Sequence, residues 1–177
     1  GFRAAGVAAG LKSTGATDLV ITMSPPQQEP AAGFFAESPD RARHELLEDD
    51  IRRLEGAGSR WNWLPLLRGI HWCRDTVERV HVVCSAGAME HFDGLQRVLA
   101  RYLPHVEVVR IPGRAGGPID TEDFEDVLGT LRPYVGAIKH AGRARRIVLD
   151  VTGGQKSASI AMTSAAMLEH IQIQYVS

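Results

Sequence analysis

Residues 146–159 have the sequence RIVLDVTGGQKSAS, and this stretch decides the fold. Its first part, Arg146 to Val151, is a short aliphatic run of the kind found in buried strands. Gly153 and Gly154 then allow a sharp turn, and the small residues that follow predict a helix. A buried strand that turns directly into a helix is typical of the βαβ units of a parallel sheet.

The rest of the chain repeats this alternation of strands and helices. Five apolar runs predict strands, at 18–23, 80–84, 106–111, 146–151 and 171–176. The predicted helices run from Ser38-Pro39-Asp40 to Gly56, over 62–74, from the Ser85–Ala88 turn to Tyr102, from a cap at Asp120 to Gly142, and after 152–157. The pattern predicts an α/β fold: a Rossmann-like, doubly wound, mostly parallel sheet of five to six strands with helices on both faces.

In such sheets a ligand binds beyond the carboxyl ends of the strands, which directs attention to the loops there. The loop at Thr152–Ser157 combines two glycines, hydroxyls and Lys156 at the start of a helix, and this combination suits a phosphate. It is not a P-loop, because Gln155 stands where that motif has glycine. A tight structural turn is the alternative interpretation. Arg114, in the Gly-rich loop 112–118, is a further ligand candidate.

Composition excludes several classes of protein. A net charge of −1 argues against binding to duplex nucleic acid or to a membrane surface. Cys73 and Cys84 have no metal-site spacing, so we expect two buried thiols in a reducing compartment. We expect no metal and no cofactor. The cluster of Trp61, Trp63 and Trp72 favours core packing or a dimer contact, with adenine stacking as the alternative.

Both ends of the chain lead us to expect a segment of a longer protein, since it begins without Met and ends directly after an apolar run. We assign residues 1–16 to a linker or the remnant of a preceding segment, and residues 17–177 to one ligand-sensing domain.

The element Asp-x-Thr-Gly-Gly-x-Lys at 150–156, late in a Rossmann-like chain, resembles the CRISPR-associated Rossmann fold (CARF) domains. That resemblance implies a homodimeric allosteric sensor of cyclic oligoadenylates, with cyclic tetra-adenylate favoured, in type III CRISPR antiviral defence. It further implies a covalently attached effector domain or membrane segment, placed on the N-terminal side. The implied location is the prokaryotic cytoplasm, as a free protein or as the cytosolic part of a membrane-anchored one.

The resemblance also implies roles for individual residues. Gly153, Gly154 and Lys156 would contact phosphates, with Gln155 between them and with Thr152 and Ser157 forming hydrogen bonds. The further implied ligand residues are Ser85, Ala86 and Gly87, which would floor an adenine or ribose pocket, and Met23 and Ser24, after the first strand. We assign no catalytic residue. Two alternatives stay open: a metal-independent ring nuclease, for which the loop lacks a general base, and an unrelated domain that binds a mononucleotide or sugar phosphate.

Overall fold

The computed structural model describes residues 10–11, 15–31, 34, 43–141 and 145–176. Its centre is a six-stranded sheet with the order β1-β6-β5-β2-β3-β4. Five strands are parallel: β2 (Asp18–Met23), β3 (Arg79–Cys84), β4 (Glu107–Arg110), β5 (Ile147–Asp150) and β6 (Gln172–Val176). This arrangement confirms the predicted Rossmann-like α/β fold.

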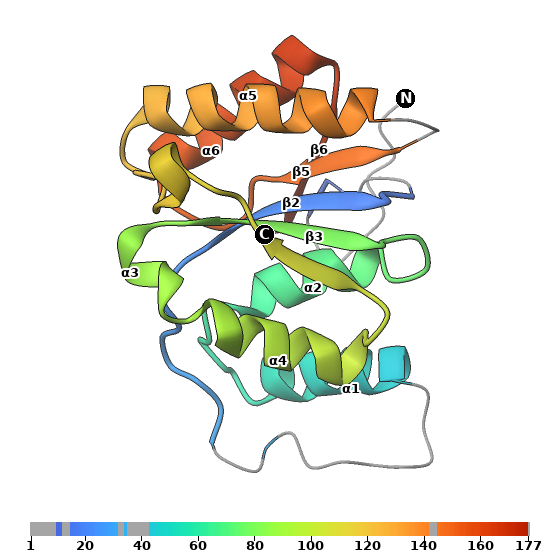
Figure 1. Ribbon diagram of the computed structural model, residues 1–177. Coiled ribbons are helices and arrows are strands. Elements are labelled where there is room, and N and C mark those ends of the chain that lie inside the picture. Colours follow the sequence, from blue (N-terminus) through green and yellow to red (C-terminus); the bar gives the residue numbers. More distant parts are fainter. Residues whose placement is uncertain (1–9, 12–14, 32–33, 35–42, 142–144, 177) are drawn as a thin grey trace.

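Helices cover both faces of the sheet (Figure 1). One face carries α1 (Arg43–Gly56), α2 (Leu64–Trp72) and α4 (Phe92–Tyr102), and the other carries α5 (Phe124–His140) and α6 (Lys156–Glu169). Two short helices, α3 (Ala86–Met89) and the 3-10 helix η1 (Arg114–Gly116), follow β3 and β4. The buried apolar residues accordingly form two clusters, one under each helical layer.

Two predicted helices differ from the structure, and two predicted helix ends lie outside the described residues. Asp123, not Asp120, caps α5, because its carboxylate accepts hydrogen bonds from the backbone N–H groups of Glu125 and Asp126. The single helix predicted before Tyr102 is divided into α3 and α4. The predicted start at 38–40 and the stop at 142 cannot be compared.

The strand order places β2 directly beside β5, although β3 and β4 separate them along the chain. The pairing is parallel, with Asp18 opposite Ile147. The chain winds outward from β2 toward β4 on one side and from β5 toward β6 on the other. The carboxyl ends of β2 and β5 therefore mark the point where the winding reverses, which is the usual ligand position in doubly wound sheets.

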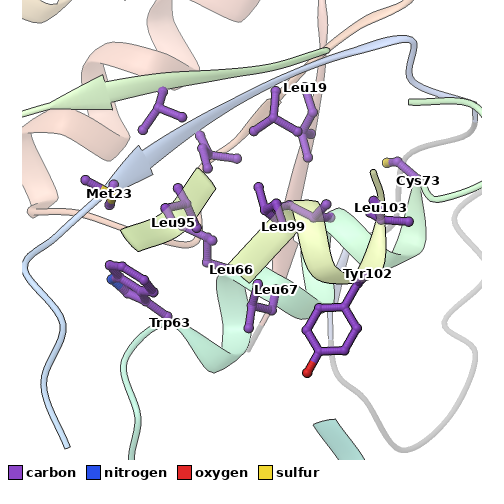
Figure 2. Packing of buried hydrophobic residues seen from close by; sticks show 14 of the residues in the cluster. Leu19, Met23, Trp63, Leu66, Leu67, Cys73, Leu95, Leu99, Tyr102 and Leu103 are labelled. Atoms are coloured by element: carbon purple, nitrogen blue, oxygen red, sulfur yellow. The ribbon is translucent and has the colours of Figure 1, made fainter. Parts of the chain in front are cut away.

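The core beneath α2 and α4 contains the residues expected there (Figure 2). Trp61 and Trp63 are each only 3% exposed, which confirms their interpretation as core residues, whereas Trp72 at the end of α2 is only half-buried. Cys73 and Cys84 are buried thiols outside any disulfide bond, as predicted, and burial raises the pKa of Cys84 to about 11. The side chain of Met23 also lies in this core, at 1% exposure.

Part of the segment assigned to a linker pairs with the sheet. Gly10–Leu11 forms β1, which runs antiparallel to β6, with Gly10 opposite Val176. Within the described ranges, none of the helices combines the length and the apolar character that crossing a bilayer requires.

Candidate functional site

A pocket of about 240 Å³ lies at the carboxyl ends of β2 and β5, where the winding of the sheet reverses. Three segments line it: the end of β2, the start of α2, and the loop between β5 and α6. The lining residues are Thr22, Ser24, Asn62, Trp63, Pro65, Leu66, Thr152, Gly153 and Gly154. Thus the structure brings Ser24 together with the first three residues of the predicted phosphate loop.

The two glycines of this loop are required by its close approach to β2. A Cβ atom added at Gly153 would lie 2.5 Å from the carbonyl oxygen of Thr22. A Cβ atom at Gly154 would lie 2.7 Å from Thr22 Cγ2, and Gly154 has a φ of +86°, which L-residues rarely adopt. The turn is therefore packed against the end of β2, and its backbone forms one wall of the pocket.

The buried carboxyl group of Asp150, at the end of β5, holds the β5–α6 loop in place through hydrogen bonds. Its Oδ1 accepts a hydrogen bond from the Thr152 backbone N–H at 2.9 Å, and its Oδ2 accepts one from Gln174 Nε2 at 2.5 Å. The carboxyl is 3% exposed, and burial raises its pKa although both hydrogen bonds act in the opposite direction. Gln174 also donates to the Gly69 carbonyl at 3.1 Å, so α2, β5 and β6 share one buried polar cluster.

Most polar side chains of the loop bind other parts of the protein. The Thr152 hydroxyl oxygen accepts a hydrogen bond from the Val176 backbone N–H at 2.8 Å. Ser157 Oγ donates to the Thr121 carbonyl at 2.8 Å, and Gln155 Nε2 donates to Glu122 Oε1 at 2.9 Å. These three side chains hold the loop against its surroundings.

The loop nevertheless keeps groups that suit an anion. Gln155 is the N-cap of α6 and makes no side-chain capping bond. The backbone N–H groups of the first turn therefore lack a side-chain cap, and they carry the partial positive charge of the helix dipole. The Lys156 side chain is exposed and forms no ion pair within the described part of the chain.

The opposite wall comes from the segment that leads into α2, where only Trp63 had been considered as a ligand contact and Asn62 had not. Trp63 Nε1 donates to the Ser24 carbonyl at 2.8 Å, and Asn62 Nδ2 donates to the Pro25 carbonyl at 2.9 Å. Asn62 Oδ1 in turn accepts from the Gln27 backbone N–H at 2.7 Å. The two side chains clamp the segment after β2. Met23 is directed into the core instead, so only its backbone is near the pocket.

Other predicted ligand residues lie outside this pocket. Ser85, Ala86 and Gly87 form the start of α3, and a Cβ atom at Gly87 would lie 3.7 Å from Pro25 Cγ. They therefore flank the segment after β2 on the side of β3. The side chain of Arg114 is 85% exposed, and its Nε lies 3.4 Å from Asp126 Oδ1.

A second, larger pocket of about 360 Å³ shares Trp63 with the first. It extends toward α4, and its wall includes Trp61, His91, Gly94 and Arg97. Since Trp63 lines both, the two hollows are neighbours at the same edge of the sheet.

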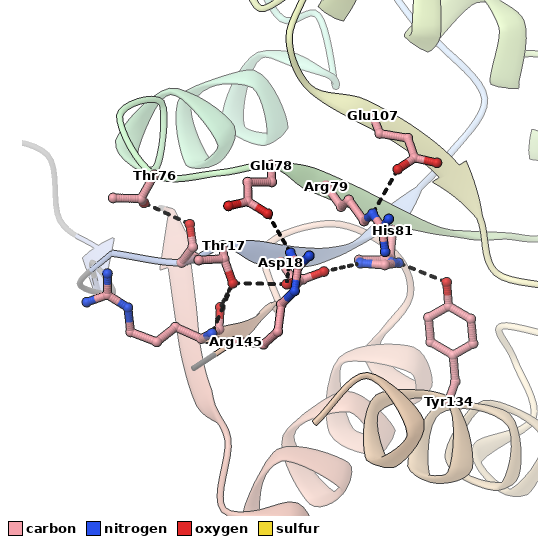
Figure 3. A network of polar contacts seen from close by, with 11 residues as sticks. Thr17, Asp18, Thr76, Glu78, Arg79, His81, Glu107, Tyr134 and Arg145 are labelled. Carbon is pink, nitrogen blue, oxygen red and sulfur yellow. Dashed lines mark hydrogen bonds and ion pairs between the residues drawn. The ribbon is translucent and has the colours of Figure 1, made fainter. Parts of the chain in front are cut away.

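A separate buried polar network lies near the amino ends of β2 and β3, away from the pocket (Figure 3). His81 Nε2 lies 2.9 Å from Asp18 Oδ1, and His81 Nδ1 lies 2.8 Å from Tyr134 Oη. Because a carboxylate only accepts, His81 Nε2 donates to Asp18 Oδ1, and Nδ1 forms the second hydrogen bond of the ring with the Tyr134 hydroxyl. Arg145 bridges Asp18 and Glu78, at 3.2 and 2.6 Å.

Opposing effects set the pKa of Asp18. Burial alone would raise it, but hydrogen bonds from His81 and Thr17 and the charges of His81 and Arg145 hold it below the ordinary value. Asp18 and His81 are enclosed, at 0% and 2% exposure, whereas Glu78 at the end of the network lies at the surface. We therefore expect the buried pair to contribute to stability. No set of three or more His, Cys, Asp or Glu side chains in the described ranges is placed to hold a metal ion.

Comparison with known proteins adds one relative. No family model matches the chain. An uncharacterized protein of Aquifex aeolicus (strain VF5) is 31% identical over 120 residues, which cover 65% of this chain and 37% of the relative. The chain thus matches little more than a third of the length of that relative.

Proposed function

We propose that this chain is a CARF-like sensor domain that binds a cyclic oligoadenylate, with cyclic tetra-adenylate favoured, and regulates an attached effector in type III CRISPR defence. The proposal includes a cytoplasmic location in a prokaryote. The observation that carries it is the β5–α6 loop, whose residues Thr152, Gly153 and Gly154 line a pocket at the switch point and lead directly into an uncapped helix start with the exposed Lys156.

The pocket supports contact with part of a larger anionic ligand. Its volume of about 240 Å³ is below the usual range for small-molecule sites, roughly 300–1,000 Å³. The wall formed by Gly153 and Gly154 offers backbone rather than side chains, which lets a phosphate approach the main chain closely. The neighbouring 360 Å³ pocket has room for a base or ribose of the same ligand.

The lining favours binding over cleavage. None of the described residues that line the 240 Å³ pocket is His, Asp, Glu, Lys or Tyr. A ring nuclease that lets a ribose 2′-hydroxyl attack the adjacent phosphate gains from a positioned base, and the lining of the 240 Å³ pocket supplies none. The neighbouring 360 Å³ pocket does include titratable side chains, those of Glu29, Glu90 and His91, so the incubation test below is needed to exclude cleavage. The Asp150 carboxyl is nearby in sequence but is buried and engaged by two hydrogen bonds.

Calorimetric titration with cyclic tetra-adenylate tests the proposal. We expect saturable binding to the unmodified protein and at least about tenfold weaker binding to Lys156→Ala, which corresponds to about 1.4 kcal/mol. Lys139→Ala is the matched control, because Lys139 lies at the end of α5 and donates to the Glu169 carbonyl at 2.7 Å. Absence of heat and of a thermal shift with the ring would overturn the proposal.

Two further measurements separate the alternatives. Chromatography of the ring after prolonged incubation with the protein should return it intact, and linear fragments would instead establish a ring nuclease. Titration with ATP, AMP and linear tetra-adenylate should give weaker binding than the ring. Preference for a mononucleotide would identify an unrelated phosphate-binding domain.

A further inference from the structure

The Asp150 carboxyl group is hydrogen-bonded to the wall of the 240 Å³ pocket. Asp150 is the last residue of β5, and the part of the β5–α6 loop that lines the pocket begins at Thr152. Asp150 Oδ1 accepts the Thr152 backbone N–H at 2.9 Å. A carboxyl group keeps an acceptor oxygen in both its ionised and its protonated form. A change in protonation therefore alters the charge beside the loop without releasing the loop.

The strands beside this carboxyl group bring no positive charge to it. On the β6 side, Gln174 is its register partner, and Gln174 Nε2 donates to Oδ2 at 2.5 Å. On the β2 side, the register places the apolar Ile21 next to Asp150. No ion pair between described residues includes Asp150. Lys156, at the start of α6, is exposed.

Helix α2 covers the same carboxyl group with its backbone. Gly69 lies against Oδ2, because a Cβ atom added at Gly69 would overlap that oxygen. Cys73 is the other titratable residue of this cluster, and its Sγ donates to Gln174 Oε1 at 3.6 Å. The charged and titratable side chains within α2 are directed to α1 instead: Arg68 to Glu55, and His71 toward Glu48. The surroundings of Asp150 are therefore polar but supply no cation.

A buried carboxyl group without a neighbouring cation is costly to ionise. Asp150 is 3% exposed, and burial holds its pKa above the ordinary aspartate value although its hydrogen bonds act in the opposite direction. A negatively charged ligand at the adjoining loop would make ionisation more costly still, since like charges repel. By reciprocity, an ionised Asp150 would weaken the binding of that ligand.

We propose that Asp150 is a positioning residue whose protonation sets the affinity of the β5–α6 loop for anions, so that anion binding takes up a proton from solvent at this carboxyl group. The inference rests on the proposed function, which makes this loop the phosphate site. The affinity is greatest when Asp150 is protonated, and it falls as the pH rises from the pKa of Asp150 in the free protein to its pKa in the complex. Acidification therefore favours the ligand-bound state.

The 360 Å³ pocket supplies the competing source of a pH dependence. Its titratable side chains are those of Glu29, Glu90 and His91, and His91 Nε2 lies 3.4 Å from Glu90 Oε1. Histidine is the residue type that most readily changes charge near neutral pH, and a protonated His91 would also attract an anion. Asp150→Asn removes the charge of one group and leaves these three in place. His91→Gln is the matched control, because it removes the competing histidine and leaves Asp150.

Calorimetric titration with cyclic tetra-adenylate in buffers of different ionisation enthalpy counts the protons taken up on binding. We expect a fraction of a proton per chain in the unmodified protein and in His91→Gln, and none in Asp150→Asn. The affinity of the unmodified protein should fall on the order of tenfold across the titration of Asp150, which corresponds to a change of about one in its pKa on binding. If Asp150 only held the loop in place, Asp150→Asn would lower the affinity equally at every pH.

An NMR titration of the Asp150 carboxyl carbon in the unmodified protein needs neither a variant nor the ring. In excess sodium sulfate, compared with sodium chloride at equal ionic strength, we expect the midpoint of Asp150 to move to higher pH. An unchanged midpoint overturns the inference. Ring binding without proton uptake, or uptake that persists in Asp150→Asn, also overturns it and leaves the sensor proposal intact. Absence of ring binding refutes the sensor, whereas a sulfate-dependent midpoint then still supports proton coupling at this loop.

Discussion

Replacing Gly153 with alanine tests the close approach of the β5–α6 loop to β2. The added methyl group would lie 2.5 Å from the Thr22 carbonyl oxygen, whereas even close C···O contacts are about 3.3 Å long. The loop must therefore move by about 0.8 Å, because the obstacle is backbone in a buried strand. The φ of Gly153 lies outside the left-handed region, so the effect is steric.

The magnitude follows from two opposing contributions. Overpacking of a well-filled site lowers the free energy of unfolding by about 1–3 kcal/mol. The reduced flexibility of the unfolded chain raises it by about 0.4–1 kcal/mol. We expect Gly153→Ala to lower the free energy of unfolding by about 1–2 kcal/mol. For a chain of this length that corresponds to a fall in Tm of about 2–8 °C.

Differential scanning calorimetry and ring titration measure the two consequences. Gly129→Ala is the matched control: it lies within α5, and its Cβ would meet nothing within 4 Å. That variant should be stabilised by about 0.5–1 kcal/mol, because alanine is the better helix former. Ring binding should weaken in Gly153→Ala alone. A Gly153→Ala protein as stable as the unmodified one, with unchanged binding, would refute the reasoning.

Three further variants test the buried polar groups. Asp18→Asn should cost about 1–3 kcal/mol near neutral pH. The pKa of Asp18 is lower in the folded than in the unfolded protein, so its carboxylate stabilises the fold above the unfolded pKa, and this stabilisation is lost as the pH falls through the folded pKa. The free energy of unfolding, measured with urea, should therefore decrease less steeply toward acid pH in Asp18→Asn than in the unmodified protein. Tyr134→Phe should cost about 1 kcal/mol through the lost bond to His81, and equal denaturation midpoints would contradict this. Gly69→Ala should lower the free energy of unfolding by about 1–3 kcal/mol through overpacking against the Asp150 carboxyl group, and an unchanged Tm would argue against that contact.

The five parallel strands were predictable because each is a short apolar run between turn residues, whereas β1 lies in the segment assigned to a linker and was not predicted. The observed β2 coincides with the predicted run at 18–23. Helix ends were less predictable, since Asp120 and Asp123 are both acceptable caps by residue type. The choice between them depends on the local hydrogen bonds of residues 120–126: Asp126 accepts a bond from the Asp120 backbone N–H while Asp123 caps the helix.

The candidate site was predictable only in part. Gly153 and Gly154 mark a loop whose position follows from the order of strand and helix. The clamp formed by Asn62 and Trp63 was not predictable, because their partners lie 35 to 39 residues away and no local pattern pairs them. The contact of His81 with Asp18 was not predictable for the same reason, because it depends on the register of the adjacent strands β2 and β3.

The adjacency of β2 and β5 has a consequence for how the protein is made. Thr17 and Arg146, whose backbones are hydrogen-bonded beside this pairing, are 129 residues apart. A nascent chain therefore completes β2, β3 and β4 well before the strand that β2 needs on its other side leaves the ribosome. Until then β2 presents an open, apolar edge, which is the kind of edge that invites pairing with another chain. Slow non-local pairing of this sort makes the pocket one of the last features to form, so the ability to bind a ligand reports on completed folding.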